Sequence, residues 1–143
     1  MHVADRRVTS SFVSHEDRGT AAGLEPLVVS SKHVGDAIVV SLVGDVDMLT
    51  APGLLSLVDD CTTDGRCKLL AVDLRQVTFL ASAGLVALID VQEFAEVRGL
   101  PFRVVTGDNR RVLRPFGITG IGGVVTVCRS MDEALSASCG PAS

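Results

Sequence analysis

The chain has 143 residues, a length that suits one domain with one hydrophobic core. Its formal net charge of −4 argues against a nucleic-acid-binding surface, which is normally basic. Charged residues near the start argue against a signal peptide, and no uncharged apolar run reaches the ~20 residues that cross a bilayer. We therefore expect a soluble, cytoplasmic protein that binds neither nucleic acid nor membrane.

The first part of the chain divides into an arm and a hairpin. Residues 1–26 mix small, polar and charged side chains without helical or strand periodicity, which predicts a flexible N-terminal arm. Two apolar runs follow, at 27–31 and 37–43, on either side of the turn pair Gly35-Asp36. This arrangement predicts a β-hairpin.

A helix is predicted shortly after the hairpin ends at Asp47. Thr50 offers an N-cap hydroxyl, and Pro52 suits the first helical turn. Apolar residues at helical spacing then continue until Asp64-Gly65, which stops the helix.

A buried strand and a second helix form the centre of the chain. The run 68–74 is too apolar to have a solvated face, which is typical of a buried parallel strand. The helix 82–97 follows, with Ser82 as its predicted N-cap and Arg98-Gly99 as its end.

The next strand is predicted at 101–106. A short third helix over 110–114 is expected after it, with Asp108 or Asn109 as its cap. The Pro-Phe-Gly sequence at 115–117 is predicted to end this helix.

The last elements complete an α/β order. A strand is predicted at 124–127, Ser130 is expected to cap a helix over 131–135, and residues 137–143 read as a tail. The order β-β-α-β-α-β-α-β-α predicts a single domain over 27–136. Its mixed β-sheet would be opened by a hairpin and covered by about four helices.

Ser82 is the most informative residue because it stands where a buried strand passes into a helix. Its hydroxyl could accept a hydrogen bond from an N–H group of the first turn. The same N–H groups and the positive end of the helix dipole also suit a phosphate group on this serine. A cap, a phosphorylation switch and a combination of the two all stay open.

Three stretches together resemble one family, the anti-sigma factor antagonists built on the STAS domain. The first is VVSLVGDVD at 39–47 followed by Thr-Ala-Pro at 50–52, and the second is VDLRQVTFL leading to SAGL within 72–85. The third is the short helix and apolar-x-Gly turn within 109–120. The resemblance covers residues 27–135 and implies a STAS-like fold.

The resemblance also implies a function. Such an antagonist binds an anti-sigma factor that has a histidine-kinase-like ATPase fold, and thereby releases the sigma factor. Phosphorylation of the serine that matches Ser82 ends the binding. A monomer or weak dimer is expected. The residues that match the family's partner-binding region are Asp45, Asp47, Thr50, Ala81, Ser82, Ala83, Gly84 and Leu85.

Two points leave alternatives open. Ala81 stands where the family commonly has an acidic residue, so Ser82 is a target of the usual kinase, of another kinase, or of none. Asp45 and Asp47 serve partner contact or are simply solvated turn residues that close a strand. The alternative function is a scaffold or sensor subunit of a multi-protein stress-signalling complex that phosphorylation does not switch.

An enzyme is not expected. Ser82 lacks the first glycine of a G-x-S-x-G nucleophile turn, and every histidine lies in the first 33 residues. No cofactor or metal is expected, because ATP would belong to the partner. The basic face formed by Arg110, Arg111 and Arg114 is interpreted as a solvated surface, with recruitment of an acidic partner as the alternative.

The four cysteines include no C-x-x-C pair, which disfavours a zinc site. We interpret Cys61 and Cys67 as reduced thiols packed beside a helix end and the following strand. A regulatory disulfide between them is the alternative, because the chain turns at Asp64-Gly65 between the two.

Overall fold

The computed structural model describes residues 5–8, 27–63 and 65–136. Its elements are β1 (Asp5–Val8), β2 (Val28–Val34), β3 (Ala37–Val46), α1 (Pro52–Thr62), β4 (Leu69–Leu80), α2 (Ser82–Val97), β5 (Phe102–Val105), α3 (Arg110–Thr119), the 3-10 helix η3 (Ile121–Gly123), β6 (Thr126–Cys128) and α4 (Met131–Leu135).

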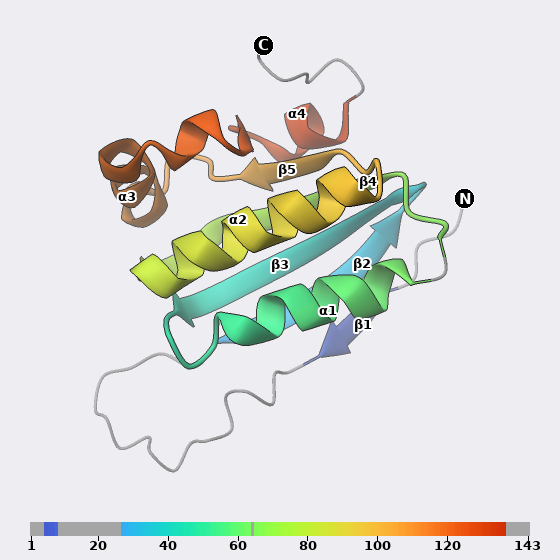
Figure 1. Ribbon diagram of the computed structural model, residues 1–143, viewed down its shortest axis with the longest axis horizontal. Coiled ribbons are helices and arrows are strands. Elements are labelled where there is room, and N and C mark those ends of the chain that lie inside the picture. The colour runs from blue at the N-terminus through green and yellow to red at the C-terminus, as the bar shows by residue number, and fades with distance from the viewer. Residues whose placement is uncertain (1–4, 9–26, 64, 137–143) are drawn as a thin grey trace.

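The strands form one mixed six-stranded sheet in the spatial order β1-β2-β3-β4-β5-β6. β1, β2 and β3 pair antiparallel, whereas β3, β4, β5 and β6 run parallel. Figure 1 shows α1 and α2 crossing the same face of this sheet. The predicted α/β class, the opening hairpin and the mixed sheet are confirmed.

The core occupies both faces of the sheet because neighbouring side chains of a strand point to opposite sides. Ile38 and Val40 of β3 belong to the large cluster that α1 and α2 cover. Val39, which lies between them, belongs to a second cluster with Ala71 of β4 and Ala134 of α4. Helices therefore shield apolar strand residues on the two sides.

The first strand differs from the sequence prediction. Asp5–Val8 forms β1, paired antiparallel with β2, where a flexible arm was predicted. An edge strand is held by backbone hydrogen bonds, so it needs no apolar alternation that the sequence could reveal. The remainder of the predicted arm and the predicted tail at 137–143 lie outside the described residues.

The third helix is longer than predicted. It continues through Pro115 to Thr119 and ends at Gly120, whose φ of +77° is left-handed. Proline removes one hydrogen bond, but the burial of Val112 and Phe116, one turn apart on the same face, holds the helix on both sides of it. The last strand is shifted as well, because η3 occupies the chain up to Gly123.

β4 is also longer than the predicted strand, and it runs to Leu80. β4 has one residue more than β3 at two places in their register. The first lies between the pairs Ser41–Asp73 and Val43–Gln76, and the second between Gly44–Val77 and Asp45–Phe79. Such bulges break the alternation of apolar and polar residues that marks a strand in sequence. The sequence prediction consequently ended β4 too early.

The side chain of the residue that caps α3 holds the bulged segment. The Asn109 amide nitrogen donates to the carbonyl oxygens of Leu74 and Val77, each at 2.9 Å. The Asn109 side-chain oxygen accepts from the Arg111 backbone N–H at 3.0 Å, so the same residue is the N-cap of α3. The sequence predicted the cap but not the tie to β4.

Candidate functional site

The candidate site lies where β3 and β4 end side by side. Val46 and Leu80 are partners in the parallel register, and the Ala81 N–H donates to the Val46 carbonyl at 2.9 Å. The loop after β3 and the first turn of α2 therefore meet at the carboxyl edge of the sheet (Figure 1). This edge brings together the two groups of residues that the sequence placed in one partner-binding region.

Ser82 is the first helical residue of α2, not its N-cap. The N-cap is Ala81, which has an extended backbone and makes no side-chain capping bond. The prediction of a capping hydroxyl was therefore wrong, because the cap position depends on a backbone angle that the residue type does not settle. The Ser82 side chain is exposed. The hydroxyl group remains accessible.

The first turn of α2 presents unpaired donors beside this serine. The N–H groups of Gly84 and Leu85 donate to the Ala81 carbonyl, at 2.8 and 3.2 Å. Those of Ser82 and Ala83 precede any intrahelical acceptor, as at every helix start. The helix dipole adds partial positive charge here, so a negative group on Ser82 is favoured by its own helix.

Gly84 allows α2 to approach the ends of β3 and β4. A Cβ atom built on Gly84 would lie 2.6 Å from Leu80 Cδ1 and 2.9 Å from Val46 Cγ1. Both side chains are buried, at 6 % and 2 % exposure, so neither has free space to move into. Gly84 therefore serves the packing that positions Ser82, and its buried backbone offers a partner little surface.

Asp45 ties the two strand ends together. Its side chain is only 8 % exposed, and the Thr78 hydroxyl donates to its Oδ1 atom at 2.6 Å. The interpretation of Asp45 as a solvated turn residue was wrong. Because Thr78 is near the end of β4, this contact links the loop after β3 to the strand that leads into Ser82.

Asp47 and Thr50 shape the loop between β3 and α1. Asp47 Oδ1 accepts from the N–H groups of Leu49 and Thr50, at 3.0 and 3.2 Å, and the Asp47 N–H donates to the Thr50 hydroxyl at 2.9 Å. Thr50 is buried and is not the N-cap of α1, which is Ala51. The predicted Thr50 cap was therefore wrong.

Exposed apolar side chains surround this edge, and the sequence analysis did not single them out. Met48 and Leu49 lie on the loop after β3, at 70 % and 68 % exposure, and Phe79 lies opposite Asp45 at 53 % exposure. Val86, one helical turn after Ser82, is 56 % exposed. We call these four residues the apolar set. Grouped exposed apolar residues are typical of protein interfaces.

The sequence contained only a weak indication that the residues of the apolar set are exposed. The pair Met48-Leu49 in a turn is an unusual apolar choice, and it could have been noted in the sequence. Phe79 resembled another core residue of a buried strand, because only the bulges of β4 turn it outward.

The other predicted groups were the two cysteines. Cys61 and Cys67 are half-buried thiols that are not joined in a disulfide, and the Cys67 thiol donates to the Leu69 carbonyl at 3.2 Å. Both pack against the main core, as the sequence predicted for side chains beside a helix end and the following strand. Within the described ranges, no three His, Cys, Asp or Glu residues group to hold a metal ion, and no helix is long and apolar enough to cross a membrane.

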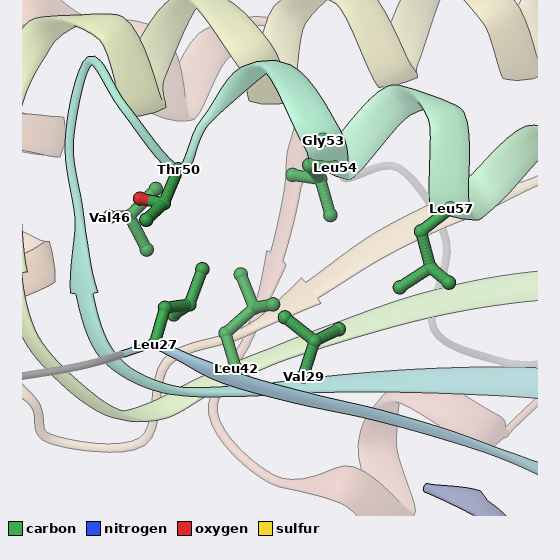
Figure 2. A pocket seen from close by; sticks show the side chains of 8 residues that line it. All are labelled: Leu27, Val29, Leu42, Val46, Thr50, Gly53, Leu54 and Leu57. Atoms are coloured by element: carbon green, nitrogen blue, oxygen red, sulfur yellow. The ribbon is translucent and has the colours of Figure 1, made fainter. Parts of the chain in front are cut away.

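A small apolar cavity lies between α1 and the β2–β3 hairpin (Figure 2). Its volume is about 10 Å³, which is close to the least that one water molecule needs. It is therefore a packing gap and not a ligand site. The lining residues are Leu27, Val29, Leu42, Val46, Thr50, Gly53, Leu54 and Leu57.

The family model described as "Mlab, STAS domain" matches residues 29–126. No curated protein matches the chain in sequence. Among solved structures, an anti-sigma factor antagonist from Mycobacterium paratuberculosis is similar, with 25% identity and a TM-score of 0.64 over 90% of this chain and 96% of that one.

Two more distant structures share the fold. SpoIIAA, an anti-sigma factor antagonist solved in its unphosphorylated form, has 12% identity and a TM-score of 0.57 over 73% of this chain and 91% of its own. A serine-to-glutamate variant of RsbS from Moorella thermoacetica has 18% identity and a TM-score of 0.58 over 78% and 91%.

The match over residues 29–126 covers most of the chain, from β2 to the start of β6. The chain therefore belongs to the STAS-domain family. Its α/β architecture is that of the solved anti-sigma factor antagonists.

Proposed function

We propose that this protein is an anti-sigma factor antagonist that acts by binding and not by catalysis. Its partner would be an anti-sigma factor with a histidine-kinase-like ATPase fold, and binding would release a sigma factor. Phosphorylation of Ser82 would end the binding. The observation that carries the proposal is an exposed hydroxyl at the start of α2, next to the apolar set.

The apolar set supports a contact that excludes water. Met48, Leu49, Phe79 and Val86 together expose large side chains from three elements of one edge. Burial of apolar surface is the dominant favourable term in most protein associations. A partner that covers this edge would also cover Ser82, because Val86 follows it by one helical turn.

A phosphate on Ser82 would oppose that contact. It adds a charge of about −1.5 to −2, and the apolar set provides no cation to compensate for its desolvation. Reversal of a 99:1 binding equilibrium takes about 5.5 kcal/mol, a magnitude that a buried unpaired charge supplies. The phosphorylated protein stays folded, because the first turn of α2 favours negative charge.

The surroundings of Ser82 also argue against its use as a nucleophile. In the part of the chain that the structure describes, no histidine lies beside the Ser82 hydroxyl. His33 pairs with Ile38 near the β2–β3 turn, at the end of β3 that is far from Ser82. A serine nucleophile requires a base within hydrogen-bond distance. We infer that the protein works in the cytoplasm as a monomer or weak dimer, as is typical of a partner-switching regulator.

The test compares Ser82→Asp with Ser82→Ala in binding to candidate anti-sigma factors by titration calorimetry. We expect Ser82→Ala to bind like the wild type and Ser82→Asp to bind at least tenfold more weakly. Ser130→Asp, at the exposed N-cap of α4, is the matched control for an added charge at a helix start. Equal affinities of the two Ser82 variants would contradict the switch.

A second arm identifies the modification. Incubation with a candidate partner and ATP, followed by intact mass and site mapping, should add one phosphate at Ser82. If binding occurs without phosphate transfer, Ala81 in place of an acidic neighbour has made the protein a constitutive binder. Assembly into large homo-oligomers would instead support the scaffold function.

A further inference from the structure

A second surface with a defined charge lies at the same end of the sheet as the candidate site (Figure 1). Arg110, Arg111 and Arg114 are exposed on α3, whereas Val112 and Phe116 on the opposite side of the helix are buried. We call the three arginines the α3 basic face. The residues stand at helical positions i, i+1 and i+4, so their guanidinium groups share one side of the helix.

The α3 basic face is not neutralised within the described part of the chain. The three ion pairs found there involve other cations, namely Arg75 with Asp73, Arg98 with Asp59 and Arg129 with Asp108. Asp108, two residues before α3, is thus already paired with Arg129, and Asp73 of β4 with Arg75. Three positive charges remain uncompensated on a chain whose formal net charge is −4.

α3 has a fixed position relative to Ser82. The Asn109 amide donates to the carbonyl oxygens of Leu74 and Val77, so the first turn of α3 rests on the strand that ends just before Ser82. Figure 1 shows α3 at the same end of the sheet as the first turn of α2. A partner wide enough to span this end of the sheet would therefore cover both Ser82 and the arginines.

The surface of α3 continues the mixed character of the candidate site. Ile118, one turn after Arg114, is 79 % exposed and adds an apolar side chain beside the basic face. Arginine is enriched in protein interfaces, and the exposed apolar side chain beside it adds surface that a partner can bury. A nucleic-acid site would instead require a longer basic stripe and stacking aromatics, whereas this chain has no Trp or Tyr.

We propose that the α3 basic face binds an acidic polypeptide segment, presented by the anti-sigma factor that docks on the Ser82 edge. The inference rests on the proposed function only for the identity of the partner. The arginines act mainly by charge, because opposite charges on two surfaces accelerate encounter more than they strengthen the final complex. Ser82 would thus control whether the complex persists, and α3 how fast it forms.

The first test needs no identified partner. A synthetic peptide of ten residues rich in Glu and Asp is titrated to millimolar concentration into the isotope-labelled full-length protein. We expect NMR shift changes concentrated at Arg110, Arg111 and Arg114, which disappear in the charge-reversal variant Arg110→Glu/Arg114→Glu. Glutamate in the first turns of a helix is favourable, so this variant should fold.

Three results would overturn the inference. One is the absence of shift changes, and another is shift changes that spread over the basic residues of the whole surface. The third is a matched DNA oligonucleotide that binds more tightly than the peptide at 150 mM salt, because the face would then be a nucleic-acid site. Arg110→Lys/Arg114→Lys should retain peptide binding, since the charge is unchanged.

The second test measures association rates with an anti-sigma factor that binds the wild type. We expect Arg110→Glu/Arg114→Glu to lower the association rate about tenfold at low salt, with little change in the dissociation rate. Lys32→Glu/Lys68→Glu changes net charge equally at exposed positions near the far edge of the sheet, and it is the control.

The two proposals fail separately in this experiment. Equal rates for the α3 variant and the control would refute the basic face as a docking surface, whatever Ser82 does. A normal effect of the arginines combined with equal binding of Ser82→Asp and Ser82→Ala would refute the phosphorylation switch and leave the basic face intact.

Discussion

Gly84→Ala tests the packing that places Ser82. The added methyl group would lie 2.6 Å from Leu80 Cδ1 and 2.9 Å from Val46 Cγ1, whereas carbon atoms in contact normally lie about 3.5–4.0 Å apart. Leu80 and Val46 are buried, so α2 must move away from the sheet or a side chain must leave its preferred rotamer.

Two effects oppose each other in this variant. Overpacking of a well-packed core costs about 1–3 kcal/mol, whereas replacement of glycine by alanine inside a helix returns about 1 kcal/mol. We therefore expect a net loss of up to about 2 kcal/mol in the free energy of unfolding. For a chain of this size the melting temperature should fall by up to roughly 6 °C.

Gly117→Ala is the matched control. Gly117 lies inside α3 and is exposed, and a Cβ atom added to it would meet no other atom within 4 Å, so only the helix preference changes. This variant should gain up to about 1 kcal/mol. Urea unfolding is followed by far-ultraviolet circular dichroism, because the chain has no Trp or Tyr. A Gly84→Ala variant as stable as Gly117→Ala would refute the close packing of α2.

Two further predictions concern ties between elements at the same edge. Asn109→Ala should lower the free energy of unfolding, measured in urea, by about 2–4 kcal/mol, because two β4 carbonyls lose a donor and α3 loses its cap. Asn109→Asp keeps the capping oxygen but has no N–H group for the two carbonyls, so it should not restore stability. Asp45→Asn and Thr78→Val should show a coupling of about 0.5–3 kcal/mol in a double-mutant cycle, and additive losses would contradict the cross-strand bond.

Local chemistry made much of the fold predictable. The hairpin followed from two apolar runs around Gly35-Asp36, and the helix Ser82–Val97 was predicted with the bounds that it has in the structure. Ser130 was predicted as a cap, and its hydroxyl accepts from the Glu133 N–H at 3.1 Å. Turn residues, apolar periodicity and these capping contacts depend on neighbours close in sequence.

The errors arose where distant residues decide the local structure. β4 extends to Leu80 because its bulges are held by Asn109, more than thirty positions away in the chain. α3 passes through Pro115 because buried contacts of the helix outweigh the lost hydrogen bond. The contacts that extend β4 and α3 are made with residues elsewhere in the chain, so the sequence of each segment does not indicate its full length.

The candidate site divides in the same way. Its serine, its glycine and its two aspartates were recognisable from the sequence, since their residue types and spacing suit a strand end followed by a helix start. Whether each of these side chains is accessible to solvent could not be recognised from the sequence. Asp45 is withdrawn into a cross-strand contact, whereas Phe79, which resembles a core residue, faces solvent.

The sequence by itself determined the order of the elements, the opening hairpin and the position of Ser82 at the start of a helix, because these follow from periodicity and turn chemistry among near neighbours. Only the tertiary structure decided which side chains reach the surface at the carboxyl edge and that α3 lies beside it. Exposure depends on the register of β4 against β3 and on the packing of α2 and α3, and those are contacts between residues far apart in the chain.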